Sequence, residues 1–133
     1  MLTTHDYLRA AKQRFTTAEF LLDHDYTLDA LYLAGYSVEC SLKALILQRT
    51  PETNQIPTFE RISSGSHWHK AEHLKAELKS NHVEMPLELV KRLRRFEWDT
   101  SLRYESGRRN RGEVRGYLKT AKAVIDWVEE QMQ

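Results

Sequence analysis

The spacing of apolar residues predicts helices along almost the whole chain. In the first segment an apolar residue recurs at alternating steps of three and four positions: Leu8, Ala11, Phe15, Ala18 and Leu22. That period places the side chains on one face of a helix. Thr3 or Thr4 can cap the start of this helix, and Asp6 suits its dipole. The polar run at 23–25 ends it.

The second segment, residues 27–49, predicts the core helix. Its main stripe is Leu31, Ala34, Val38, Leu42 and Leu45, and further apolar residues cover the opposite side: Leu33, Tyr36, Cys40, Ala44 and Leu47. A helix that is apolar nearly all round lies at the centre of a fold or in an interface. Pro51 follows, and proline cannot continue a helix.

The remainder of the chain predicts shorter elements. Residues 51–66 are rich in Pro, Ser and Thr, which indicates an irregular connector. A short helix is expected at 69–80 and a longer one at 86–98. A polar loop with two glycines follows at 99–112, and a final helix at 113–132. The predicted fold is all-α, an up-and-down bundle of four main helices plus a short additional helix.

Length and composition narrow the class of protein. A chain of 133 residues is expected to form one domain, 1–133. The single cysteine, Cys40, has no partner for an internal disulfide, which favours a reducing compartment. We read no apolar run that approaches the ~20 residues of a membrane helix, and no signal-peptide core near the start. We therefore expect a cytoplasmic protein with no membrane partner.

The charge of the chain is unevenly distributed along the sequence. Residues 91–119 hold 10 Lys/Arg and four Asp/Glu, a formal charge of +6. The rest of the chain holds 10 Lys/Arg and 15 Asp/Glu, a formal charge of −5. Separated charge of this kind attracts a polyanion to one face, or docks a partner of opposite polarity.

Three stretches together carry a family resemblance. The first is residues 30–46, ALYLAGYSVECSLKALI, with its Gly-Tyr, Glu and Leu-Lys-Ala. The second is the pair His73-Leu74. The third is residues 98–104, WDTSLRY, followed by a final helix with Trp127 near its end. This combination resembles the HEPN family of small all-helical prokaryotic domains and covers nearly the whole chain.

The resemblance implies a helical bundle that is usually a homodimer. Members are often encoded beside minimal nucleotidyltransferases in toxin–antitoxin modules, and many are metal-independent ribonucleases. Their motif is an arginine, four to six residues and a histidine, at the start of the last long helix.

This chain departs from that motif. The corresponding region holds Arg103, Arg108, Arg109 and Arg111, but no histidine follows His82. Without an imidazole the region lacks the usual general base near neutral pH. The departure favours a non-catalytic role, so that only the fold and a binding function carry over from the resemblance.

Glu39 is the unusual residue of the core helix. A buried carboxylate needs a partner, and the sequence offers Lys43 one turn later or Arg103 from the loop. One interpretation is an ion pair that fixes helix packing. The other is a polar pocket in which Glu39, Lys43, Arg103 and Tyr104 surround a nucleotide or an RNA phosphate.

The basic residues predict where an anion binds. The expected phosphate contacts are Arg103, Arg108, Arg109, Arg111 and Arg115, with Lys43 and Tyr104 secondary. The run at 91–95 presents its charges around Leu93 and, taken alone, is typical of a solvated helix face. We expect the fold to bring this run and the arginines at 108, 109 and 111 into the same half of the molecule, as one basic surface. Trp98 is expected to pack in the core, although it and Tyr104 are also able to stack on a base.

The predicted ligand is a nucleotide or RNA, or an acidic partner protein such as a nucleotidyltransferase. The alternatives are a ribonuclease that works without the motif histidine, and a non-catalytic interaction scaffold. No cofactor is implied.

Two further features have weaker chemical interpretations. His69, Glu72 and His73 match the zinc-protease pattern H-x-x-E-H, which would place two imidazoles on one helix face. The pattern is short and made of common polar residues, so we expect no metal site. Cys40 lacks a neighbouring histidine or a metal-spaced cysteine, and we expect an inert core thiol.

Overall fold

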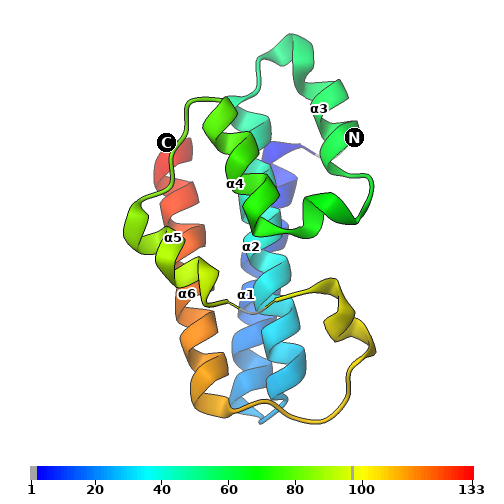
Figure 1. The fold of residues 1–133 in the computed structure, drawn as a ribbon, viewed down its shortest axis with the longest axis vertical. Helices are drawn as coiled ribbons and strands as arrows, with labels where there is room; N and C mark the ends of the chain where they lie inside the picture. The colour runs from blue at the N-terminus through cyan, green and yellow to red at the C-terminus, as the bar shows by residue number, and fades with distance from the viewer. Residues whose placement is uncertain (1–2, 97) are drawn as a thin grey trace.

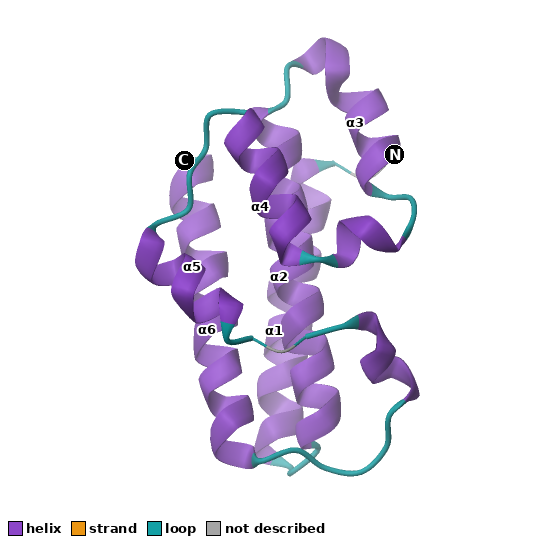
Figure 2. Cartoon of the chain, in the orientation of Figure 1, coloured by secondary structure: helices purple, strands orange, loops and turns teal. Residues whose placement is uncertain are grey.

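The computed structural model describes residues 3–96 and 98–133, and only the backbone at 66 and 67. These residues form helices joined by loops, with no strand among them (Figure 2). The elements are α1 (Thr4–Asp23), α2 (Thr27–Arg49), η1 (Glu52–Asn54), α3 (Gln55–Ile62), η2 (Ser66–His69), α4 (Ala71–Ser80), α5 (Leu87–Arg94), η3 (Thr100–Tyr104) and α6 (Arg111–Met132). The prediction of an all-α helical bundle is confirmed.

Three long helices form the centre of the bundle. α1 and α2 run antiparallel, and α6 packs against both of them (Figure 1). α4 lies against α2, and α5 lies against α6. The ends of α2 and α6 meet, because Gln48 and Arg49 donate side-chain hydrogen bonds to the carbonyls of Met132 and Gln131. This arrangement leaves α2 between α1, α4 and α6.

The start of α1 is capped as the sequence predicts. The backbone N–H of Asp6 donates to Oγ1 of Thr3 at 3.1 Å, and the N–H of Thr3 donates back to Oδ2 of Asp6 at 2.8 Å. This reciprocal pair satisfies two backbone donors that the helix itself leaves free. The hydrogen bond from the Thr3 backbone lowers the pKa of the Asp6 carboxyl.

α2 is the core helix, with the predicted bounds. Its largest fully buried side chains are Leu31, Leu42, Leu45 and Ile46. Our expectation that no stretch is apolar enough for a membrane helix was wrong. Among the described residues α2 passes that test by length and composition, but 83% of its most apolar window is buried inside the protein.

The segment predicted to be an irregular connector is largely helical. It forms η1 and α3, in which Thr58 and Ile62 are buried and Phe59 packs against Tyr7 of α1. Pro57 is tolerated because it lies in the first turn of α3, where no intrahelical N–H bond is needed. Too few apolar residues occur in this short segment to establish a period, so the sequence alone favoured a loop.

The predicted helix at 86–98 ends before Trp98, which packs against α2 instead. α5 stops at Arg94, and Trp98 turns back onto α2. Its indole Nε1 donates to the carbonyl of Tyr32 at 2.9 Å, and the two rings stack with centroids 5.9 Å apart. A Cβ at Gly35 would lie 2.0 Å from Cδ1 of Trp98. Glycine at 35 therefore lets the indole lie directly on the helix backbone.

We predict that Gly35→Ala destabilises the protein by roughly 1–3 kcal/mol, because the methyl group overlaps the indole. In a Trp98→Ala background the same change should be neutral or stabilising by up to about 1 kcal/mol, because alanine is the better helix former. Urea unfolding of the four proteins measures both effects. Equal destabilisation in the two backgrounds would rule out the contact as the cause.

Candidate functional site

A polar cluster is buried where α2 meets η2. Oε2 of Glu39 accepts a hydrogen bond from Nζ of Lys43 at 2.9 Å, and Oε1 accepts from Nδ1 of His69 at 2.9 Å. The Glu39 and Lys43 side chains are each 6% exposed, and that of His69 is 35% exposed. Because a buried carboxylate without partners is costly, the two donors account for its place in the core. We call these residues the Glu39 cluster.

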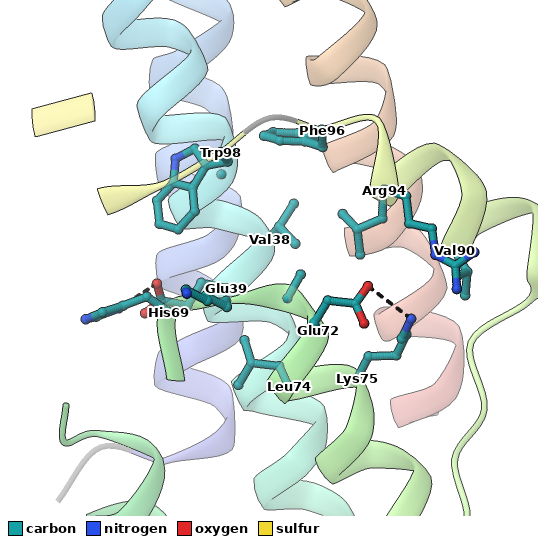
Figure 3. A pocket seen from close by; sticks show the side chains of 14 residues that line it. Val38, Glu39, His69, Glu72, Leu74, Lys75, Val90, Arg94, Phe96 and Trp98 are labelled. Carbon is teal, nitrogen blue, oxygen red and sulfur yellow. Dashed lines mark hydrogen bonds and ion pairs between the residues drawn. The ribbon is translucent and has the colours of Figure 1, made fainter. Parts of the chain in front are cut away.

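The cluster borders a cavity of about 290 Å³. The walls come from α2, the η2–α4 segment, α5 and the stretch that holds Phe96 and Trp98. Figure 3 shows Glu39 and His69 on one side of the hollow, with Arg94 and Lys75 on the other. Lys70 and Glu72 also line the cavity, and Glu72 pairs with Lys75 at 3.4 Å. The cavity therefore combines apolar walls with two carboxylates and several cations.

The structure brings together two of the predicted site residues and separates the others from them. Glu39 and Lys43 form the expected ion pair. Arg103 and Tyr104 lie on η3 and are not among the residues that line the cavity. Nε of Arg103 donates instead to the carbonyl of Thr100 at 3.2 Å, and Tyr104 is 86% exposed.

The loop arginines lie over the turn between α1 and α2. Arg109 pairs with Glu105 at 2.8 Å, and Arg111 pairs with Asp25 of that turn at 2.6 Å. The backbone N–H of Arg109 also donates to Oγ1 of Thr27. Nearby carboxylates thus offset much of the loop's positive charge.

Other cations form no ion pair with a described residue. Arg108 and Arg115 are exposed and make no side-chain ion pair with any described residue. A group at the end of α5 also makes no side-chain ion pair with any described residue, and we call it the α5 cations: Lys91, Arg92, Arg94 and Arg95, of which Arg92 is half-buried and the others are exposed. Arg94 lines the cavity, and the other three lie on the same helix or directly after it. The sequence alone predicts that this run joins the loop arginines in one basic surface.

His69 is the site residue that the sequence reading did not place. It was considered only as part of the zinc pattern. α4 begins at Ala71, so His69 and His73 do not share a helix face, and His69 faces Glu39 instead. Across residues 3–96 and 98–133 no group of three or more His, Cys, Asp or Glu is placed to hold a metal ion. The sequence shows that the second oxygen of the Glu39 carboxylate needs a partner, but it does not show that a histidine 30 residues away supplies it.

Cys40 has the environment of an inert thiol. It is buried on α2 next to Glu39. Burial, with a smaller contribution from the Glu39 charge, raises the pKa of the thiol to about 12. At neutral pH the group is therefore protonated, and a thiol in that state is a poor nucleophile.

Because the Glu39 cluster is buried, breaking one side of it should be costly. We predict that Glu39→Gln destabilises the protein by about 3 kcal/mol, since it leaves the Lys43 ammonium buried without a counter-charge. The double variant Glu39→Gln/Lys43→Met should lose less stability than the two single losses added together. Denaturant unfolding checks this. Strict additivity would show that the pair contributes nothing as a pair.

The comparison with known families agrees with the fold and with the motifs of the sequence. The family model described as HEPN domain matches residues 4–131, nearly the whole chain. A comparison with curated proteins and with solved structures found no match. The chain therefore belongs to the HEPN domain family.

Proposed function

We propose that this single domain binds the phosphates of RNA or of a nucleotide through the α5 cations and the adjoining cavity. The observation that carries the proposal is the pairing pattern of the basic residues. Among the described residues the α5 cations have no carboxylate partner, whereas Arg109 and Arg111 each have one. HEPN domains commonly dimerise and bind RNA, which agrees with a role of this kind.

Unpaired cations are the better phosphate ligands for an electrostatic reason. A phosphate that approaches Arg109 must compete with Glu105 and feels its repulsion. A phosphate that approaches Arg92 or Arg95 meets a guanidinium that pairs with no carboxylate of the described residues. Each phosphate neutralised there also releases condensed counterions, which favours binding at low salt.

The aromatic residues next to the α5 cations support a nucleic acid rather than a bare anion. Phe96 follows Arg95 directly, and Phe96 and Trp98 both line the cavity. Aromatic rings beside a basic surface are typical of single-stranded nucleic-acid sites, because bases stack on them while cations hold the backbone.

The other candidate residues take secondary places in this proposal. Arg108 and Arg115 are exposed and free to contact phosphate at a distance from the cavity. Arg103 and Tyr104 lie on η3, where the exposed ring can stack on a base. Arg109 and Arg111 contribute least, because they are already paired.

The setting that we propose is the cytoplasm and a homodimer. The partner protein would be a nucleotidyltransferase in a toxin–antitoxin pair, as is common among relatives. An acidic protein surface would meet the same α5 cations and compete with RNA for them.

We predict that Arg92→Ala/Arg95→Ala weakens binding of a single-stranded RNA oligomer by tenfold or more at about 0.1 M salt and lowers the salt dependence of binding. The matched control is Arg9→Ala/Lys12→Ala, which removes two charges from α1, where both residues already sit in ion pairs. Arg108→Ala/Arg109→Ala tests the loop separately. Fluorescence anisotropy at several salt concentrations measures all four proteins. Equal affinity of wild type and the α5 variant would refute the proposed surface.

A second candidate function is RNA cleavage, favoured by one contact. The Nδ1 bond to Glu39 fixes the His69 imidazole and leaves Nε2 as the nitrogen able to accept a proton from a ribose hydroxyl. In that case a general base comes from η2 rather than from the last helix. Glu39 would act as a positioning residue.

The cleavage hypothesis predicts a metal-independent activity. Labelled RNA should be cut in the presence of a chelator, and His69→Gln should slow cutting by about 10²-fold or more while keeping an N–H donor for Glu39. His5→Gln on α1 is the control. If RNA stays intact after incubation with the wild-type protein, the cleavage hypothesis is wrong and only the binding function remains.

A further inference from the structure

We infer that the cavity beside α2 binds the guanine base of a guanosine phosphate, with Glu39 accepting hydrogen bonds from the base. The inference rests on the proposed function, because the same site that holds phosphate then also selects the base. It adds a chemical preference that phosphate binding by itself does not require.

The size and the walls of the cavity suit one base. A volume of about 290 Å³ is at the lower end for a small-molecule site and leaves no room for a stacked pair of nucleotides. Apolar side chains form much of the lining: Val38, Leu74, Val90, Leu93, Phe96 and Trp98. A flat heteroaromatic ring is buried favourably between such walls, provided that the polar groups on its edge find partners.

The polar groups that line the hollow lie on two sides. Glu39 and His69 occupy one side, whereas Arg94, Lys75 and Glu72 occupy the other, and Glu72 pairs with Lys75 (Figure 3). A phosphate close to Glu39 or Glu72 would face a carboxylate, so the anion belongs beside Arg94, which pairs with no described residue. The ligand must therefore carry hydrogen-bond donors at one end and negative charge at the other. A nucleotide has this arrangement, with the base at one end and the phosphate at the other.

The hydrogen bonds of Glu39 determine which base fits. Lys43 and His69 each donate to one carboxylate oxygen. Each oxygen has a second lone pair, so the group is still able to accept two further bonds. Because both existing bonds also hold the carboxylate in place, its acceptor direction is fixed before a ligand arrives.

Guanine is the base that can donate hydrogen bonds to both carboxylate oxygens from one edge. Its N1–H and its 2-amino group are adjacent donors on one edge. Adenine and cytosine place an amino donor next to a ring nitrogen lone pair, which a carboxylate repels. Uracil offers a single N–H between two carbonyl oxygens. A matched two-point contact with a base typically discriminates by about tenfold or more against the wrong base.

The test compares nucleotides on the unaltered protein. Isothermal titration with GMP, IMP and AMP varies the donor edge, because IMP lacks only the 2-amino group of GMP. We expect GMP to bind about tenfold or more tightly than AMP, with IMP between them. Equal affinity for GMP and AMP, or no binding of either, would overturn the assignment for free nucleotides.

A second arm distinguishes free nucleotide from RNA as the source of the base. Two single-stranded oligomers of equal length are compared by anisotropy, one of uridines with a single guanosine and one with adenosine at that position. Preference for guanosine in RNA without GMP binding identifies RNA as the ligand. GMP preference without any preference in RNA identifies a free nucleotide. Absence of preference in both arms sinks the inference.

Variants separate this inference from the proposed function. Glu39→Gln should abolish the preference for guanine over adenine, because an amide presents one donor and one acceptor. Leu93→Trp leaves the Glu39 cluster intact and fills the cavity from α5, so it should reduce GMP affinity about tenfold or more even if Glu39→Gln unfolds the chain. Circular dichroism verifies that Leu93→Trp is folded.

The outcomes of the two proposals remain distinguishable. If Arg92→Ala/Arg95→Ala lowers the affinity for every RNA oligomer equally and no base preference exists, the phosphate surface is supported and the guanine site is refuted. If that variant has no effect and GMP still binds selectively, the cavity stands and the RNA surface falls.

Discussion

The carboxylate of Glu39 is buried in the central helix, and the rest of the site depends on how it is satisfied. Lys43 comes from the same helix and makes an ion pair that any helix with this spacing can form. His69 comes from a segment 30 residues away and brings η2 against α2. Since breaking a buried polar pair costs several kcal/mol, this contact fixes the start of α4 and one wall of the cavity.

Another wall of the cavity depends on a steric constraint. Gly35 has no side chain, and the Trp98 indole occupies the space where a Cβ would be. The indole also donates to the Tyr32 carbonyl, so both packing and a hydrogen bond hold the residue after α5 onto α2. Gly35 and Glu39 are one helical turn apart, so a single stretch of α2 positions both walls of the cavity.

Carboxylates near each basic residue determine which charges a ligand can use. The sequence places ten basic residues in one stretch, but the fold divides them. Loop arginines lie over the acidic turn between α1 and α2, where Arg111 pairs with Asp25, and Arg109 pairs with Glu105 of the loop itself. The α5 cations make no ion pair with any described residue. The functional surface is therefore smaller than the charge pattern suggests, and it adjoins the cavity.

The sequence by itself determined the long helices, because a period of three to four residues in α1, α2 and α6 reflects burial on one face of each. It also determined that Glu39 needs a partner and that Lys43 is in reach. Tertiary structure alone decided that His69 is the second partner, that Trp98 leaves its helix for Gly35, and that Arg109 and Arg111 meet carboxylates. These contacts join residues far apart in the chain, or depend on where a loop lies, and no local period encodes such distances.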